Sequence, residues 1–214
     1  MEIAATIDRA KYDVFRWRYE LSLPKKLVMA LGLAALAGIL AQVRFQLPWS
    51  PVPITAQTFA VLLAGVLLGR WWGGVSMAIF GGLGWMGIPW FSGWASGFTA
   101  TGGYIIGFIL AALFLGFFVD KYIRSRSFFS MLGLMLFANF VLIYIPGLIW
   151  LWVWLKAAGT SATFAVLLGM GFLPFIAGDI TKAIAAAAIA RGVTPKQAYG
   201  KEVDKDGWST WRVP

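Results

Sequence analysis

The sequence predicts an all-α membrane protein with six transmembrane helices. Of its 214 residues, 60% are hydrophobic and only 13% are charged, and the mean hydropathy is +0.77. A soluble domain of this size needs a more polar surface, so we expect the chain to lie in a lipid bilayer. Apolar stretches between turn signals predict spans at residues 27–43, 54–68, 73–90, 102–119, 128–155 and 164–190.

The distribution of Lys and Arg orients these spans. If the chain begins in the cytoplasm, fifteen basic residues fall in inner segments, and the outer segments receive only Arg44 and Lys156. With an even number of spans, this bias predicts that both termini are cytoplasmic. The net charge of +9 does not indicate nucleic-acid binding, because the basic residues lie in connections and form no cluster with stacking aromatics.

The sequence divides into an N-terminal cytoplasmic segment (1–24), a six-helix membrane domain (25–192) and a polar cytoplasmic tail (193–214) that we expect to be peripheral. Two alternatives remain open for the first segment: an amphipathic helix on the cytoplasmic leaflet, or a disordered extension. The helical alternative rests on apolar residues at alternating spacings of four and three, namely Ile3, Ile7, Ala10, Val14, Trp17 and Leu21.

Residue types that most enzymes need are missing, since the chain has no Cys and no His. Their absence excludes thiol nucleophiles, imidazole bases and nearly all transition-metal ligand sets. We therefore do not expect an enzyme, and we expect no cofactor and no metal site.

Asp179 and Lys182 are the acid and the base that the predicted spans place deep in the bilayer. A charged residue at the centre of a membrane helix costs about 2.5 kcal/mol or more, so it usually lines a cavity or a pathway. Residues three apart share a helix face, which makes the pair a candidate ligand site. The alternative is an inert salt bridge that serves packing.

Backbone breakers precede this pair. Pro174 lies between Gly171 and Gly178, so we expect a broken sixth span whose last helix starts near Gly178. Asp179 would then lie in the first turn of that helix, where free N–H groups and the helix dipole favour a carboxylate. Irregular backbone at this depth is tolerated where it lines a cavity.

Thr55 and Gln57 add hydrogen-bonding groups at the predicted outer side. They follow a proline-rich loop at 48–53 and open the second span. Polar side chains at this position are less costly beside a cavity than beside lipid.

An uncharged, glycine-rich loop at 88–97 also lies at the predicted outer side. It can act as a lid, with Phe91 and Trp94 as apolar walls, and it runs into Thr101-Gly102-Gly103-Tyr104. The three irregular segments therefore converge on one side of the membrane, and Tyr104 joins the candidate site.

Two other features have open interpretations. Asn139, in the fifth span, is expected to form an interhelical hydrogen bond for packing. In the first span, Ala30, Ala34 and Gly38 repeat every four residues and form a smooth stripe against which another helix can pack closely. That helix could belong to a partner protein or to this chain itself.

Several motifs occur in a fixed order along residues 48–193: P-W-S-P-V-P-I-T-A-Q-T from Pro48, L-L-A-G from Leu62, L-G from Leu68, G-I-P from Gly87 with Phe91 and Gly93, T-G-G-Y from Thr101, G-F-L-P-F from Gly171, and Gly178-Asp179 with Lys182. In order, spacing and outer-side placement they resemble the BioY family, the biotin-specific substrate-binding components of energy-coupling-factor (ECF) vitamin transporters.

The resemblance implies that the chain captures biotin from outside for ATP-driven uptake, together with a membrane coupling subunit and two ATPase subunits. It implies that the coupling subunit docks on the stripe of Ala30, Ala34 and Gly38. Asp179 can accept hydrogen bonds from the ureido N–H groups of biotin, and Lys182 can donate to a carbonyl or carboxylate. The expected binding residues are Asp179, Lys182, Tyr104, Gln57, Thr55, Trp94 and Phe91.

Two alternatives remain open at this point. The first is a component of the same fold for another vitamin or small heterocycle. The second is an intramembrane structural protein whose buried pair is inert and which binds no ligand.

Overall fold

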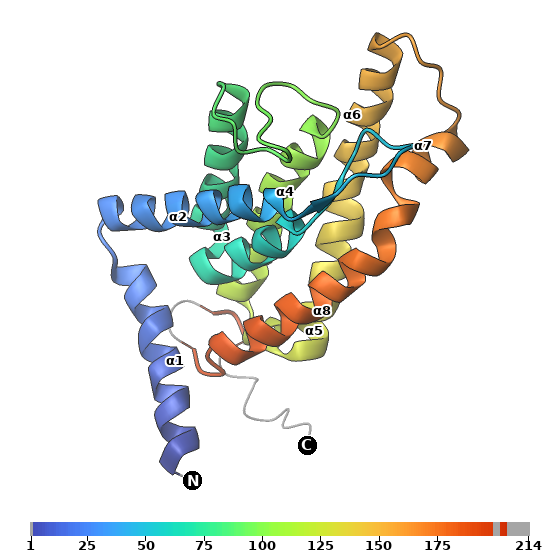
Figure 1. The fold of residues 1–214 in the computed structure, drawn as a ribbon. Helices are drawn as coiled ribbons and strands as arrows, with labels where there is room; N and C mark the ends of the chain where they lie inside the picture. The colour runs from blue at the N-terminus through green and yellow to red at the C-terminus, as the bar shows by residue number, and fades with distance from the viewer. Residues whose placement is uncertain (1, 199–201, 205–214) are drawn as a thin grey trace.

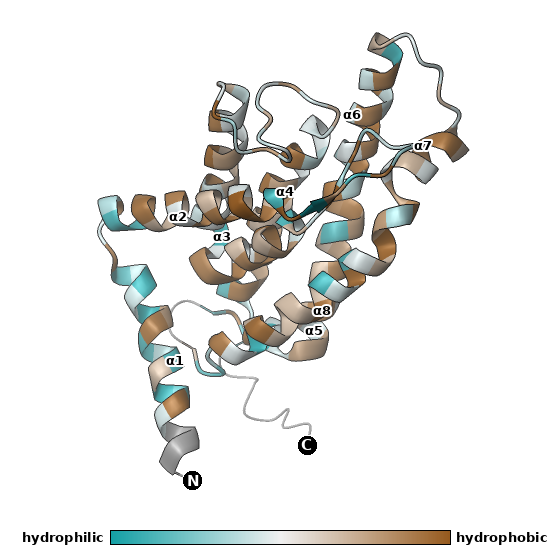
Figure 2. Cartoon of the chain, in the orientation of Figure 1, coloured by the Kyte–Doolittle hydropathy of each residue, from teal (hydrophilic) through white to brown (hydrophobic). Residues whose placement is uncertain are grey.

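The chain folds into a bundle of α-helices (Figure 1). The computed structural model describes residues 2–198 and 202–204. Within this described part, five helical units are long and apolar enough to cross a membrane, namely Leu23–Gln42, Gln57–Trp85, Gly102–Lys121, Phe128–Ala157 and Phe164–Val193. Figure 2 shows hydrophobic residues along most of these helices. The expectation of an all-α membrane protein is confirmed.

A short antiparallel ribbon follows the first of these helices, α2 (Leu23–Gln42). Its two strands are β1 (Arg44–Phe45) and β2 (Ile54–Thr55). The proline-rich loop lies between them, so the ribbon holds both ends of this loop together and fixes where Thr55 enters the next helix.

Helix α3 (Gln57–Trp85) contains both the second and the third predicted span, and it bends at Gly69. Gly69 has a φ of 78° and a ψ of −179°, a conformation that glycine adopts readily and L side chains avoid. The two arms then approach closely, since a Cβ on Gly73 would lie 2.8 Å from the Cα of Gly65. A single glycine therefore replaces the longer connection that the sequence predicted.

The fifth predicted span consists of three parts. It comprises α5 (Phe128–Phe137), a π-helical turn η2 (Ala138–Ile143) and α6 (Tyr144–Ala157). Helix α4 (Gly102–Lys121) packs along both η2 and α6. The π-helical turn was not predicted from the sequence.

The last span is broken, as the sequence predicts. Helix α7 (Phe164–Gly171) ends before Phe172, whose φ of −139° and ψ of −62° are not helical. A short 3-10 turn η3 (Leu173–Phe175) leads into α8 (Ile176–Val193). Helix α8 begins at Ile176 rather than near Gly178, and Asp179 lies in its first turn.

The small-residue stripe of α2 packs against this chain's own helices, which is one of the two alternatives left open for it, and docking of a partner subunit on the stripe stays a prediction. Ala30 and Ala34 have no exposed surface, and the hydroxyl of Ser76 on α3 donates to the carbonyl oxygen of Ala30 at 2.8 Å. A Cβ on Gly38 would lie 3.1 Å from the Cβ of Trp90. Small side chains are needed here because the chain's own α3 and the loop after it occupy this face.

Residues 2–20 form helix α1 (Glu2–Glu20), which extends away from the bundle (Figure 1). The structure therefore has a helix where the sequence left a disordered extension open. Ile7, Val14 and Trp17 of the expected apolar face are at least half exposed, whereas Leu21 is buried.

The C-terminal end of α1 is anchored to the bundle by Arg18. Its guanidinium group donates to the carbonyl oxygens of Val66 and Leu67 at 2.9 and 3.0 Å. It also forms a 2.7 Å ion pair with Asp120 at the end of α4. This contact neutralises a buried charge and satisfies carbonyl groups at the end of the first arm of α3.

The start of the C-terminal tail is also packed against the bundle. Arg126, in the 3-10 turn η1 (Ile123–Arg126), forms a 2.8 Å ion pair with Glu202, and both side chains are buried. The backbone N–H of Val203 donates to the carbonyl oxygen of Lys121. Residues 202–204 of the tail that the sequence predicts to be peripheral are therefore held against the bundle, and residues 199–201 and 205–214 lie outside the described residues.

Candidate ligand-binding site

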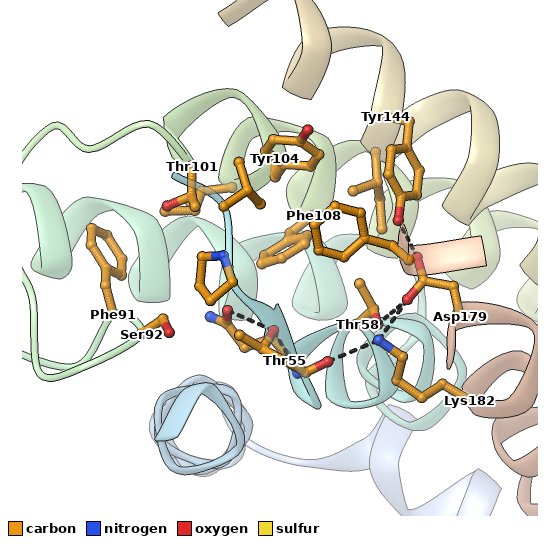
Figure 3. Close-up of a pocket in the computed structure, with 16 residues that line it drawn as sticks. Thr55, Thr58, Phe91, Ser92, Thr101, Tyr104, Phe108, Tyr144, Asp179 and Lys182 are labelled. Atoms are coloured by element: carbon orange, nitrogen blue, oxygen red, sulfur yellow. Dashed lines mark hydrogen bonds and ion pairs between the residues drawn. The ribbon is translucent and has the colours of Figure 1, made fainter. Parts of the chain in front are cut away.

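A cavity lies where the loop before α3, the loop before α4, and helices α3, α4, α6 and α8 meet (Figure 3). Figure 3 shows Asp179 and Lys182 at one end of it and Phe91 and Ser92 at the other. The lining residues are Val52, Pro53, Thr55, Gln57, Thr58, Phe91, Ser92, Thr101, Tyr104, Ile105, Phe108, Ile143, Tyr144, Phe175, Asp179 and Lys182.

Asp179 is 2% exposed and lies at the centre of a hydrogen-bond network. Its Oδ2 accepts hydrogen bonds from the amide of Asn139 at 2.9 Å and from the hydroxyl of Tyr144. Its Oδ1 accepts from the hydroxyl of Thr58 at 3.4 Å and pairs with Lys182 at 2.5 Å. The break before α8 makes this possible, because it places Asp179 in the first turn of a helix at the cavity wall.

Lys182 lies one turn further along α8, on the same face. Its ammonium group contacts Asp179 and also donates to the backbone carbonyl oxygen of Thr55 at 2.8 Å. The pair is therefore neutral overall and joins α8 to the entrance of α3, which reduces the cost of burying two charges.

Thr55 and Gln57 form the polar wall next to this pair. The hydroxyl of Thr55 donates to the side-chain oxygen of Gln57 at 3.1 Å, and Gln57 is buried. The strand β2 fixes Thr55 so that its carbonyl oxygen is directed toward Lys182.

The opposite end of the cavity is closed by the loop after α3. Phe91 is buried, with its ring 5.3 Å from that of Phe80, and it occupies the space that a side chain on Gly84 would fill. Ser92 follows it, and its hydroxyl is buried without a hydrogen-bond partner among the described residues. Such a group is a natural contact for a ligand, because a buried unpaired hydroxyl is costly.

Tyr104 lines the cavity with its ring and not with its hydroxyl. The hydroxyl donates to the carbonyl oxygen of Gly171 at 2.8 Å, at the break in the last span. Its ring packs edge-on against Tyr144 with centroids 5.8 Å apart. Tyr104 therefore ties the first turn of α4 to the break between α7 and α8.

The structure brings six of the seven expected binding residues to the cavity and leaves Trp94 outside. The indole of Trp94 is 67% exposed, and its φ of 59° turns the chain at this point. Its contact with a ligand stays a prediction that requires the loop to move.

Tyr144, Thr58 and Asn139 are the contributors that sequence reasoning missed or assigned to packing. Asn139 does form an interhelical hydrogen bond, as expected, but its partner is Asp179. The sequence signal that could have identified these three residues is a polar side chain within a predicted membrane span. For Tyr144, the π-helical turn hid this signal, because an ordinary helix would direct it away from Asn139.

The fold and the cavity together define a membrane-embedded protein that binds a small molecule with both polar and apolar parts. Residues 12–198 match the model of the BioY family, and the chain belongs to this family. The resemblance inferred from the motifs is thereby confirmed.

Relatives and a solved structure agree. The probable biotin transporter BioY of Methanothermobacter thermautotrophicus is 54% identical over 157 residues, 71% of this chain and 100% of that protein. The biotin transporter BioY of Thermotoga maritima is 32% identical over 148 residues, 67% of this chain and 82% of that protein. A crystal structure of the S-component for biotin from an ECF-type ABC transporter matches with a TM-score of 0.69 at 28% identity, covering 80% of this chain and 93% of that one. The expectation of a transport protein rather than an enzyme is confirmed.

Proposed function

We propose that this chain is the substrate-binding subunit of a biotin uptake system. The observation that carries the proposal is the buried Asp179–Lys182 pair at one end of a cavity whose other walls include Phe91, Tyr104 and Phe108. Biotin has matching chemistry, since its ureido ring has two N–H donors and a carbonyl acceptor, and its bicycle and side chain are largely apolar. Pockets of this kind use a few placed polar groups for orientation and apolar walls for affinity.

The individual roles follow from the geometry. Asp179 accepts from the ureido N–H groups, and Lys182 exchanges its contact with the carbonyl of Thr55 for a carbonyl or carboxylate of the ligand. Gln57 and the unpaired hydroxyl of Ser92 are further polar contacts. Phe91 and Tyr104 pack on the apolar part.

The two arms of α3 count as separate spans, so the chain crosses the membrane six times with both termini in the cytoplasm of a cell with a bacterial-type plasma membrane. Anchoring of Arg18 and Glu202 at the same end of the bundle supports this arrangement. The loop that carries Phe91 then faces outside, where biotin is captured.

Uptake requires partner subunits, which we propose to be a membrane coupling subunit and two ATPase subunits. The match to an S-component supports such partners. Because α3 covers Ala34, the docking surface that we propose is the exposed face of α2 that includes Gly32 and Ala35, where Gly32 has no neighbouring atom within 4 Å of a Cβ.

Titration calorimetry of the purified protein with biotin tests the function. Asp179→Asn and Lys182→Met are each expected to weaken binding by about 1.5–3 kcal/mol or more, as loss of a charge-assisted hydrogen bond does. Asp8→Asn and Lys156→Met make the same chemical changes at exposed positions away from the cavity and should bind like the parent. Each single change leaves a buried charge without its ion-pair partner, which can itself weaken binding. The affinity of the double variant should therefore be measured together with those of the single variants.

The outcomes separate the alternatives. A parent protein that binds another vitamin from a panel, and not biotin, would show that the same fold serves a different heterocycle. A parent that binds no vitamin would favour the structural protein with an inert pair. Unchanged binding in both single variants would place the biotin site elsewhere.

A further inference from the structure

We propose that the π-helical turn η2 is a positioning device for ligand binding, because it brings Asn139 and Tyr144 together on one oxygen of Asp179. The proposal rests on the biotin-binding function proposed above. Asn139 and Tyr144 are positioning residues in this account, and Asp179 is the group that contacts the ligand.

The side chains of Asn139, Asp179 and Tyr144 form a buried hydrogen-bonded group. Asn139, Asp179 and Tyr144 are 1%, 2% and 4% exposed, so water does not compete with their hydrogen bonds. Asn139 and Tyr144 both donate to Oδ2, whereas Thr58 and Lys182 contact Oδ1. Figure 3 shows the hydroxyl of Tyr144 directed at the carboxylate. The carboxylate is therefore fixed in direction before a ligand arrives.

The spacing of the two donors requires the π-helical turn. Asn139 and Tyr144 are five residues apart, and in an α-helix of about 3.6 residues per turn such residues point about 140° apart. In a π-helix, hydrogen bonds join residues five apart, so these residues lie nearly above one another on one face. Turns of this kind occur often at functional sites.

Residues next to η2 favour the π-helical conformation over a regular α-helix. Pro146 has no backbone N–H, so it cannot donate the hydrogen bond that a regular helix would form to Leu142. On the other side, Gly107 of α4 allows close approach, since a Cβ there would lie 2.5 Å from the Cα of Ile143 and 2.8 Å from the carbonyl oxygen of Leu142. Gly103, in the Thr-Gly-Gly-Tyr motif, lies in the same way against Pro146.

The hydrogen bonding of Asn139 indicates that this residue positions Asp179. Its amide nitrogen donates to Asp179, but its side-chain oxygen is buried without a hydrogen-bond partner among the described residues. Leaving a buried acceptor unpaired costs about 1–3 kcal/mol. An asparagine that served packing alone would have no reason to keep this orientation. A carboxylate held in place binds more tightly, because less freedom is lost when the ligand docks.

A double-mutant cycle on biotin affinity tests the proposal. Tyr144→Phe removes the donor and keeps the ring, and we expect biotin to bind about 10–150-fold more weakly, as loss of one hydrogen bond to a charged group implies. In an Asp179→Ala background, the same change should weaken binding less than about twofold, because there is no carboxylate left to position. Asn139→Leu should behave in the same way in both backgrounds.

A purely structural role gives a different pattern. If Tyr144→Phe weakens binding equally with and without the Asp179 carboxylate, the hydroxyl acts on the shape of the pocket and the proposal is wrong. Tyr104→Phe is the comparison, because its hydroxyl bonds to Gly171 and not to Asp179, and its effect should be the same in both backgrounds. A parent protein that does not bind biotin would instead refute the proposed function.

The π-helical turn itself is tested by two glycine substitutions. Gly107 does not itself line the cavity, but a methyl group there presses on the backbone of η2 at Leu142 and Ile143. Gly107→Ala should therefore weaken biotin binding at least about fivefold. Gly133→Ala in α5 has no neighbouring atom within 4 Å of its Cβ and should leave binding unchanged. Parent-like binding by folded Gly107→Ala would overturn the link to the turn. If that variant does not fold, the Tyr144 cycle still decides.

Discussion

The side-chain amide of Gln42 donates a 3.0 Å hydrogen bond to the carbonyl oxygen of Phe91, which joins the end of α2 to the loop that closes the cavity. Its amide oxygen accepts from the backbone N–H groups of Gly93 and Trp94, each at 3.1 Å. The side chain of Gln42 therefore binds the backbone of this turn on both sides of Ser92, at Phe91 and at Gly93 and Trp94. Gln42 thereby holds this loop on α2, beside the hydrogen bonds that join the loop to α3.

We therefore predict that Gln42→Leu speeds dissociation of biotin about 5–30-fold, as loss of roughly 1–2 kcal/mol of hydrogen bonding implies. The association rate should change much less, because the cavity lining is unaltered. Stopped-flow kinetics with the parent and the variant measures both rates. Gln46→Leu is the matched control, because the amide of Gln46 donates to Ser50 and not to the loop. Equal dissociation rates in the parent and Gln42→Leu would show that other contacts close the cavity.

The second prediction concerns the packing of α3 on α4. A Cβ on Gly65 would collide with backbone atoms of Ala112 and Gly116, which cannot rotate away. Gly65→Ala should therefore destabilise the protein by about 1–3 kcal/mol, the usual cost of overpacking. Gly82→Ala in the same helix meets nothing within 4 Å and should match the parent. Melting temperatures in one detergent compare the two, and equal values would mean that α4 moves aside freely.

The third prediction concerns the anchor of α1. Arg18→Met should release the C-terminal end of this helix, because it removes the hydrogen bonds to Val66 and Leu67 and the ion pair with Asp120. We expect faster amide hydrogen exchange in α1 and a lower melting temperature. Arg16→Met removes an exposed ion pair with Glu20, which contributes at most about 1 kcal/mol, and should change neither. An unaltered exchange pattern in Arg18→Met would show that the anchor lies elsewhere.

Much of the site could be predicted because its residues carry local signals. Asp179 and Lys182 are charged in an apolar span, Thr55 and Gln57 are polar at the start of one, and the glycines and Pro174 mark the break before α8. Burial cost makes such residues visible in the sequence. For this reason the expected residues converge on one cavity, apart from Trp94.

The remaining features depend on tertiary contacts that leave no local pattern. Residue spacing shows that Ala30 and Ala34 share a face, but it cannot show which helix covers that face. The π-helical turn arises from Pro146 together with the close approach of α4, so its position became visible only when the helices were packed. Arg18 looked like one more cytoplasmic charge, because its partner Asp120 lies 102 positions along the chain.

The last prediction separates internal packing from docking on α2. Ala34 is fully buried, whereas its neighbour Ala35 is exposed on an adjacent face of α2. Ala34→Leu should lower the melting temperature, because the added volume has no space. Ala35→Leu should leave the melting temperature and biotin binding unchanged but reduce co-purification with the coupling subunit, since close helix approach requires small residues. Normal assembly of Ala35→Leu would place the coupling subunit on another helix, and weak assembly caused by Ala34→Leu at parent-like stability would return the docking surface to the stripe.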